Sequence, residues 1–394
     1  MARTPTSPRA EARPHDPLLL VAVLGLTAVG LVMVYSASAV KAGAELHDQF
    51  HFLKRQLLAA GVGVGLLLLG LRIGARGAEK LAYAVLGLAV LALLLVMVPG
   101  VGRMAGGARR WINLGIVSFQ PAELAKVALV LYLARSLAHK QEKMRLFSIG
   151  FLPHVLVAGL LTGLCLLQRD FGTGVVLGLV LFAMLFAAGA PVSYLLGAML
   201  VAAPVTWRVV AGTPYRMERI RAFLDPFQHR QGIGWQMVES LLGIGNGGWL
   251  GQGLGQGKSK LFYLPAAHTD FIAAVVAEEA GLLGIGLLLL LYALFAWRGL
   301  RAAWRAPDAF SCYAALGITV LVTAQALINL SVVFVLLPTK GLTLPFVSYG
   351  GSSLMTLLGA SGLLLAISGG RGGFLSRGTA AVRVGPGVAA EGAR

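Results

Sequence analysis

The chain contains 394 residues, of which 57% are hydrophobic and only 12% are charged. Soluble domains carry about 25% charged residues, so this composition excludes an ordinary soluble enzyme and indicates a polytopic membrane protein. The formal net charge of +17 requires no nucleic-acid partner, because cytoplasmic loops of membrane proteins are enriched in basic residues. Cys165 and Cys312 both lie in apolar runs, which predicts neither a disulfide framework nor a metal cluster.

Apolar runs long enough to cross a bilayer recur along the chain. A helix needs about 20 apolar residues to span a hydrocarbon core of about 30 Å. The runs predict an all-α polytopic fold with about ten transmembrane helices. The predicted spans are residues 17–40, 56–74, 80–99, 119–138, 148–167, 173–190, 193–210, 270–297, 310–336 and 349–370.

The distribution of lysine and arginine predicts the orientation of these helices. Basic residues cluster in alternate connecting segments, which the positive-inside rule assigns to the cytoplasm. Both termini are therefore expected to be cytoplasmic. The Pro-, Gly- and Arg-rich segments 1–16 and 371–394 are predicted to be disordered tails, and residues 17–370 are predicted to form one transmembrane domain.

Three segments on the outer side are unusual in length or composition: 100–121, 211–269 and 337–350. The large extracytoplasmic loop 211–269 contains amphipathic stretches at 217–227 and 235–245, which predict short helices on the membrane surface or dipping into the bundle. The third segment is rich in proline and glycine. Irregular backbone among membrane helices is tolerated only where protein buries it or where it lines a wet cavity.

Charged residues mark the end of the first outer segment and the start of the next helix. Arg109 and Arg110 in GARRWINLG carry guanidinium groups that suit phosphate binding, and contact with lipid headgroups is the alternative. Glu123 and Lys126 in FQPAELAK are three residues apart and can meet on one helix face. They form either an ordinary pair at a helix end or part of a polar cavity, which intramembrane charges usually line.

The glycine-rich run GIGNGGWLGQGLGQGKS at 243–259 partly matches two nucleotide-binding motifs. No strand is predicted before it and no βαβ unit after it, which excludes a dinucleotide site, and Gln252 stands where a Walker A loop requires glycine. Two interpretations remain for this run with Lys258 and Lys260. It is either a mobile loop or an amide-rich loop that contacts a phosphate.

The stretch LPAAHTDFIAAVVAEE at 264–279 places three carboxylates at the mouth of an apolar run. At 100° and 1.5 Å per residue, Glu278 and Glu279 lie on other helix faces from Asp270 and more than about 10 Å deeper. The three therefore do not converge as a two-carboxylate glycosidase site would require. Two interpretations remain for the start of this helix. Either Thr269 or Asp270 is its N-cap, or Asp270 is a reactive carboxylate at the mouth of the apolar run. Both glutamates need partners or stay protonated.

The chain as a whole resembles the SEDS family (shape, elongation, division and sporulation) of membrane peptidoglycan glycosyltransferases. The stretch TKGLTLPF is closer to the cell-division branch, typified by FtsW, than to the elongation branch, typified by RodA. Ala266 and Arg169 depart from the family, whose members often carry glutamate and proline there. The matching motifs, in family order, are VYSAS at 34, GARRWINLG at 107, FQPAELAK at 119, DFGTG at 170, ERIRAFLDPF at 218, the glycine-rich run, YLPAAHTDFI at 263 and PTKGLTLPFVSYGGSS at 338.

The resemblance implies that the protein polymerises lipid II, the undecaprenyl-pyrophosphate-linked disaccharide-pentapeptide, on the outer face of the bacterial cytoplasmic membrane at the division septum. It also implies a class B penicillin-binding protein and other divisome proteins as partners, and a divalent cation, Mg or Mn, as the one cofactor to consider. Asp270 matches the family aspartate and is the expected general base. The expected substrate-binding residues are Arg109, Arg110, Glu123, Lys126, Arg219, Lys258, Lys260, His268, Ser352 and Ser353.

Two other functions are compatible with a helical bundle that holds intramembrane charge. One is a flippase that moves lipid II across the membrane, and the other is a non-catalytic scaffold that recruits the penicillin-binding protein. Glycosyl transfer is favoured over transport because the ionisable motifs cluster on the predicted outer face. A transport path would instead need polar groups across the membrane midplane.

Overall fold

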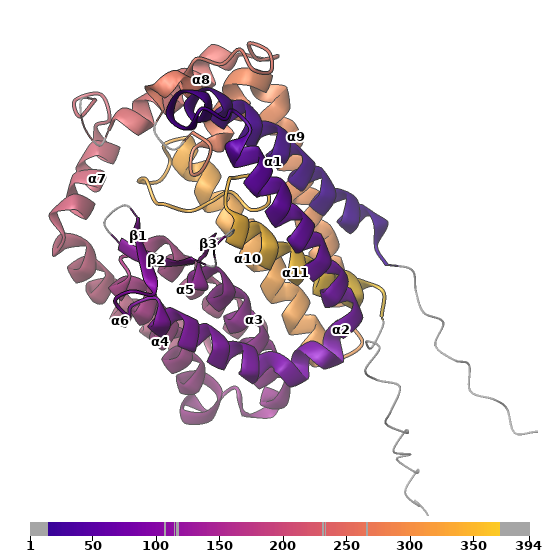
Figure 1. Cartoon of the computed structure of the whole chain (residues 1–394). Coiled ribbons are helices and arrows are strands. Elements are labelled where there is room, and N and C mark those ends of the chain that lie inside the picture. Colours follow the sequence, from indigo (N-terminus) through magenta and orange to yellow (C-terminus); the bar gives the residue numbers. More distant parts are fainter. Residues whose placement is uncertain are drawn as a thin grey trace, which may run out of the picture.

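The computed structural model describes residues 15–105, 108–113, 115, 118–230, 232, 234–264 and 267–370, so nearly all of both predicted tails, and Ala266, lie outside the described residues. The described chain is a helical bundle with one small sheet (Figure 1). Its helices are α1 (Pro17–Leu46), α2 (His51–Leu95), α3 (Pro121–His139), α4 (Leu152–Leu167), α5 (Phe171–Ala187), α6 (Val192–Ala211), α7 (Pro214–Leu224), α8 (Trp235–Gly247), α9 (Ile272–Trp304), α10 (Ala309–Val333) and α11 (Gly351–Ser368), and its strands are β1 (Gly102–Ala105), β2 (Ala108–Asn113) and β3 (Ser118–Phe119).

Helices occupy the places of all the predicted spans. The spans predicted at 56–74 and 80–99 are joined in α2, which bends at Gly74, where φ is 61° and the backbone leaves the helical conformation. Seven of the described helices are long and apolar enough to cross a membrane by themselves, and α5 is apolar but shorter. The all-α architecture is confirmed, and the count of about ten crossings stays a prediction.

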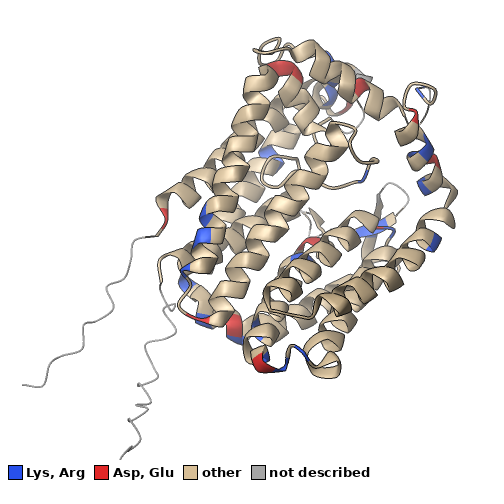
Figure 2. Ribbon diagram, turned by 180° about the vertical axis from the view of Figure 1, so that it is seen from behind, with Lys and Arg blue, Asp and Glu red and all other residues tan. Residues whose placement is uncertain are grey.

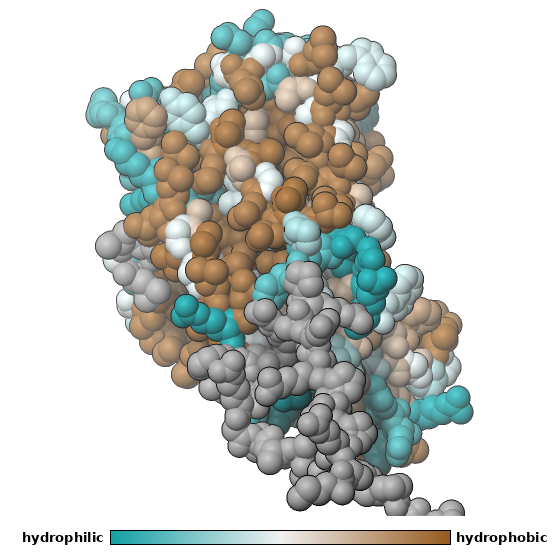
Figure 3. Space-filling view, turned by 90° about the vertical axis from the view of Figure 1, so that its right-hand side faces the viewer, coloured by the Kyte–Doolittle hydropathy of each residue, from teal (hydrophilic) through white to brown (hydrophobic). Residues whose placement is uncertain are grey.

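The surface of the bundle is that of a multi-pass membrane protein. Acidic and basic residues lie mostly at the two ends of the bundle and around its interior, while long stretches of helix carry none (Figure 2). The side wall shown in Figure 3 is a continuous apolar band. Because lipid replaces water around such a band, the helices must satisfy their own backbone polar groups.

Close backbone contact joins α2 and α11, which pack along each other. A Cβ atom added at Gly362 would lie 2.0 Å from the carbonyl oxygen of Leu67, and one added at Gly70 would lie 2.6 Å from the carbonyl oxygen of Gly359. Only glycine fits at these positions. Membrane helices commonly pack through small residues in this way, because lipid provides no hydrophobic drive between helices.

The two ends of the described chain meet at the same end of the bundle. The carboxylate of Asp16 caps α1 by accepting hydrogen bonds from the amides of Leu18 and Leu19, and it also accepts one from Arg298 Nε of α9 at 2.7 Å. The amide of Asp16 donates to Ser368 Oγ at the end of α11. This arrangement agrees with termini on one side of the membrane, and the assignment of that side to the cytoplasm stays a prediction.

Two of the three segments predicted to lie on the outer side contain regular secondary structure. Segment 100–121 forms an antiparallel sheet in the order β1-β2-β3, which the sequence analysis did not predict. The strand ARRWIN is short, and its partners are only two to four residues long, so the sequence carries little β signal. The two amphipathic stretches of the large loop form α7 and α8, as predicted. Segment 337–350 is irregular, and much of it is buried among the helices.

Candidate active site

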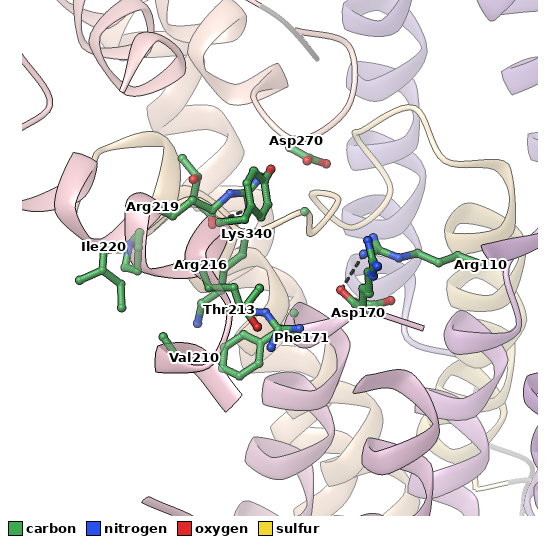
Figure 4. A pocket seen from close by; sticks show the side chains of 16 residues that line it. Arg110, Asp170, Phe171, Val210, Thr213, Arg216, Arg219, Ile220, Asp270 and Lys340 are labelled. Atoms are coloured by element: carbon green, nitrogen blue, oxygen red, sulfur yellow. Dashed lines mark hydrogen bonds between the residues drawn. The ribbon is translucent and has the colours of Figure 1, made fainter. Parts of the chain in front are cut away.

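A cavity of about 940 Å³ opens between the start of α5, the helix α7 and the segment after α10. Two carboxylates, Asp170 and Asp270, face it. In Figure 4, Asp270 lies across the cavity from Arg216 and Phe171, with Arg219 and Lys340 on one side and Arg110 on the other. Excess positive charge in a cleft attracts anions. The cations that line this cavity are Arg110, Arg169, Arg216, Arg219 and Lys340.

A second cavity of about 470 Å³ adjoins the first. Its lining includes Arg55, Glu123, Tyr349 and Ser353. Three residues, Arg110, Asp270 and Gly341, line both cavities. The carboxylate of Asp270 therefore stands where two chambers meet, and groups bound in either chamber can reach it.

Asp270 is not the N-cap of α9. That position is Phe271, and the helix start has no side-chain capping bond, so the alternative in which Asp270 or Thr269 caps the helix is wrong. A Cβ atom added at Gly341 would lie 3.5 Å from Asp270 Oδ2, so the glycine leaves space beside the carboxylate. Burial raises the pKa of Asp270 to about 6, against the opposing effect of Arg219 and Arg110. A carboxylate with this pKa can exchange a proton near neutral pH, which suits a general base.

The N-terminus of α5 builds the wall opposite Asp270. Asp170 caps this helix by accepting hydrogen bonds from the amide and the hydroxyl of Thr173, which fixes Phe171 as the first helical residue. The guanidinium carbon of Arg216 and the ammonium of Lys340 lie 5.7 Å and 5.5 Å from the centre of the Phe171 ring. Cation–π contacts of this kind attract both cations, so the ring holds two like charges in the cavity.

Arg219 contributes donors from α7. Its Nη1 donates to the carbonyl oxygen of Thr339 at 3.0 Å, and its guanidinium lies over the Tyr215 ring. Among the described residues, Arg219 Nε and Thr339 Oγ1 are buried and have no hydrogen-bond partner. Unsatisfied buried polar atoms are rare and costly, and these two belong to residues that line the cavity.

Arg110 ties the sheet to the turn before α5. Its Nε donates to the carbonyl oxygen of Gln168 and its Nη2 to that of Arg169. Arg109, its neighbour on β2, is half-buried and, within the described residues, is absent from the linings of both cavities. Two arginines were predicted to bind phosphate. Arg110 lines both cavities together with Asp270, and in the described part of the structure Arg109 lines neither of them.

Both interpretations of the FQPAELAK motif, an ion pair at a helix end and part of a polar cavity, apply to Glu123 and Lys126. Lys126 is 1% exposed, and its ammonium lies 3.0 Å from Glu123 Oε1 and 2.6 Å from Gln325 Oε1. Glu123 also lines the second cavity. The pair is therefore an intrahelical ion pair built into the cavity wall, with Lys126 behind Glu123.

The glycine-rich loop is bound to α9, which is interrupted at Gly281, where φ is 64° and ψ is −159°. The amides of Gln252 and Gly253 donate to the carbonyl oxygens of Glu278 and Glu279, and the amide of Leu282 donates to that of Gly248. Loop backbone therefore replaces the hydrogen bonds that the helix loses at its break.

The side chains of both glutamates hold the same loop. Glu278 accepts hydrogen bonds from the amides of Lys258 and Ser259. Glu279 pairs with Lys260 Nζ and accepts from Ser36 Oγ of α1. The expectation that these buried acids need partners is thus confirmed. Lys258 and Lys260 belong to this junction, and in the described part of the chain neither lines either of the two cavities around Asp270.

The last three candidates have different surroundings. Ser353 lines the second cavity. Ser352 is buried and links α11 to the start of α3, since its hydroxyl donates to the carbonyl oxygen of Ser118 and accepts from the amide of Gln120. His268 packs against Phe52 and Tyr349, and burial lowers its pKa to about 4, so its ring is uncharged at neutral pH.

Six charged residues that line the two cavities are not among the predicted site residues: Arg55, Arg103, Arg169, Asp170, Arg216 and Lys340. Arg216 precedes Arg219 by one helical turn, and this spacing predicts a shared face once α7 is recognised as a helix. Lys340 and Asp170 stand inside the quoted motifs PTKGLTLPF and DFGTG. Arg55 carries no motif, and only the packing of α2 reveals it.

The donor set was also tested for a divalent cation. Within the described residues, no group of three or more His, Cys, Asp or Glu side chains converges. Mg²⁺ commonly takes one or two carboxylates and completes its shell with water and substrate phosphates. Asp170, which lines the cation-rich cavity, fits this mode of binding.

The fold and the two cavities define a multi-pass membrane protein with a cation-rich interior around the carboxylate of Asp270, which lines both cavities. The model of the cell cycle protein family FtsW/RodA/SpoVE matches residues 17–371, and the chain belongs to this family.

Several relatives and solved structures resemble the chain over nearly its whole length. A probable peptidoglycan glycosyltransferase FtsW of Trichlorobacter lovleyi is 47% identical over 90% of this chain and 93% of its own, and stage V sporulation protein E of Bacillus subtilis is 40% identical over 90% and 96%. A chain from a peptidoglycan synthase complex that coordinates polymerization and crosslinking has a TM-score of 0.75 at 33% identity, covering 90% of this chain and 97% of its own. The rod shape determining protein RodA of Thermus thermophilus has a TM-score of 0.65 at 31% identity, covering 90% and 96%.

Proposed function

We propose that this protein is a peptidoglycan glycosyltransferase that polymerises lipid II into glycan strands, with Asp270 as the general base. The observation that carries this proposal is the position of Asp270, which lines both cavities beside a cluster of cations. The family membership and the relatives named peptidoglycan glycosyltransferase support it.

In this mechanism, Asp270 takes the proton of the acceptor sugar hydroxyl as its oxygen attacks the anomeric carbon of the donor. A glycosidic C–O bond forms, and the bond between that carbon and the pyrophosphate oxygen breaks. The leaving pyrophosphate gains charge that must be stabilised in a site of low polarity. Arg216, Arg219 and Lys340 would bind it, since all three line the cavity that Asp270 faces.

A divalent cation, Mg²⁺ or Mn²⁺, would be held by Asp170 and by the pyrophosphate oxygens. When bound, it would supply further positive charge to the leaving group. Arg110 and Gly341, which line both cavities together with Asp270, are not among the proposed ligands of this cation.

We further propose that the enzyme works at the division septum of the bacterial cytoplasmic membrane, with a class B penicillin-binding protein that crosslinks the strands and with other divisome proteins. The similarity to a chain of a complex that couples polymerization to crosslinking supports the crosslinking partner. The relatives named FtsW support the septal role.

The decisive experiment is a polymer assay with purified lipid II, using this protein in complex with its cognate penicillin-binding protein, whose transpeptidase is blocked by a β-lactam. Asp270→Asn should lower the initial rate about 10²- to 10⁴-fold, as expected for loss of a general base, while binding of lipid II is retained. Asp48→Asn is the matched control, because Asp48 is paired with Lys54 on the surface.

Equal polymer from wild type and Asp270→Asn would place the base elsewhere. If neither the wild type nor the variant makes polymer, liposomes that contain labelled lipid II separate the remaining functions. Movement of the label across the bilayer would identify a flippase. No movement, together with normal growth of cells that carry Asp270→Ala, would identify a scaffold.

A further inference from the structure

The three residues that lead into α9 are held through their backbone carbonyl groups. The amide of Tyr349 donates to the carbonyl oxygen of His268 at 2.9 Å. Ser348 Oγ donates to that of Thr269 at 2.5 Å, and Asn329 Nδ2 donates to that of Asp270 at 2.9 Å. These three bonds fix the backbone just before Phe271, the N-cap residue of α9, which makes no side-chain capping bond.

Asn329 uses both protons of its amide at this point. Its Nδ2 also donates to the carbonyl oxygen of Leu342 at 2.7 Å. Asn329 therefore bridges the backbone of Asp270 to the residue that follows Gly341, the glycine that faces the Asp270 carboxylate. Both contacts are carbonyl oxygens, so the amide must present its NH₂ group to them.

Ser348 forms a similar bridge. Its hydroxyl donates to Thr269 and accepts a hydrogen bond from the amide of Leu344 at 2.8 Å. Asn329 and Ser348 are 1% and 4% exposed, so water cannot replace either side chain. The segment 342–348 and the segment 268–270 are consequently locked together from two sides.

The arrangement of the Asn329 side chain carries an energetic cost. In the part of the chain that the structure describes, Asn329 Oδ1 is buried without a hydrogen-bond partner. An apolar side chain of the same shape would avoid that orphan acceptor, and replacing a polar side chain by an apolar one is often close to neutral for stability when no partner is left unpaired. Here the two carbonyl oxygens would lose their donor, and one of them belongs to Asp270.

We propose that Asn329 and Ser348 are positioning residues, which hold the Asp270 carboxylate at the junction of the two cavities by fixing its backbone against segment 342–348. This inference rests on the proposed role of Asp270 as the base. A displacement of about 1 Å in a reacting group can cost about 10²-fold in rate, so loss of either bridge reduces turnover more than substrate binding.

The test uses the complex with its penicillin-binding protein, the transpeptidase blocked, and the initial rate of lipid II consumption as the readout. Asn329→Leu, which has nearly the same shape and no donor, should lower kcat about 10- to 100-fold with KM changed less than about threefold. Ser348→Ala should lower kcat less, and Ser348→Thr, which keeps the hydroxyl, should restore it. Tyr292→Phe is the matched structural control, because Tyr292 donates to Pro345 of the same segment without contacting 268–270.

A double-mutant comparison separates positioning from a general loss of structure. In the Asp270→Asn background, Asn329→Leu should cause almost no further loss of the residual rate, because residues that act through one group are not additive. An equal fractional loss in both backgrounds would overturn the proposal, as would a wild-type kcat in a folded Asn329→Leu variant.

Two further outcomes are separable. If Asn329→Leu does not fold, the Ser348→Ala and Ser348→Thr pair decides, and equal rates for the two would overturn the proposal. If Asp270→Asn polymerises like the wild type, the base lies elsewhere, and the positioning role fails with the assignment of Asp270. If the wild type makes no polymer, the proposed function itself fails. A dead Asp270→Asn beside an unaffected Asn329→Leu would overturn only the positioning role.

Discussion

Lys260 Nζ lies 2.7 Å from Glu279 Oε1 in an ion pair whose side chains are 6% and 0% exposed. Removing one partner of a buried pair leaves an uncompensated charge, which typically costs about 3–5 kcal/mol. Lys260→Met should therefore lower the thermal unfolding temperature of the detergent-solubilised protein markedly. The double variant Lys260→Met/Glu279→Gln should recover most of the loss, and equal instability of the two would argue that the charge is not what matters.

The rate of polymerisation should depend on pH through Asp270. Because burial raises the pKa of this carboxylate to about 6 from its ordinary 3.8, the base is protonated and inactive below that value and active above it. The rate at lipid II concentrations well below KM, which reports the free enzyme, should be about tenfold lower at pH 5 than on the plateau above pH 7. A profile measured from pH 4.5 to 8.5 checks this, and a flat profile down to pH 5 would contradict it.

Gly341→Ala should move that profile to higher pH. The new methyl group would lie 3.5 Å from Asp270 Oδ2, an ordinary contact that the backbone accepts, and it would exclude water from the carboxylate. Desolvation disfavours the charged form, so activity at pH 6 should fall more than activity at pH 8. Gly286→Ala is the control, because a Cβ atom added there has no neighbour within 4 Å, and its profile should match the wild type.

Arg219→Gln should weaken binding of the lipid-linked substrate. Hydrogen bonds to charged groups contribute about 1.5–3 kcal/mol each, which corresponds to roughly a 10- to 100-fold rise in KM, with a weaker dependence of KM on salt. Arg221→Gln on the same helix provides the control, because Arg221 is exposed and does not line the described cavities. A similar KM for both variants would show that KM depends on the positive charge of α7 as a whole and not on the position of Arg219 in the cavity.

Gly362→Ala should destabilise the contact between α2 and α11. Its methyl group would lie 2.0 Å from the carbonyl oxygen of Leu67, and overpacking of this kind costs about 1–3 kcal/mol. Gly65→Ala on α2 has no atom within 4 Å of the new methyl group and should be neutral or slightly stabilising, because alanine favours the helix. Thermal unfolding of the two variants in one detergent makes the comparison.

Helix positions could be predicted from the sequence because membrane spans depend on composition over about 20 residues. Asp270 could be predicted from its place at the mouth of an apolar run and from its match to the aspartate of the family motif. The amphipathic α7 and α8 also carry a local signal. The sheet and the partners of Glu278 and Glu279 could not be predicted, because they depend on contacts between distant segments, such as Ser36 with Glu279. Lys260 is an example. Its charge alone is compatible with binding a phosphate, whereas the structure pairs it with Glu279.

The interruption of α9 at Gly281 has a mechanical consequence. The residues before it, from Ile272 to Glu279, are buried, while Leu282 and Leu283 just after it face outward. An unbroken rod would carry any tilt of its lipid-facing half directly to Asp270. Because the loop backbone hydrogen-bonds across this break, the buried half of α9, which begins two residues after Asp270, is tied to the glycine-rich loop as well as to the lipid-facing half.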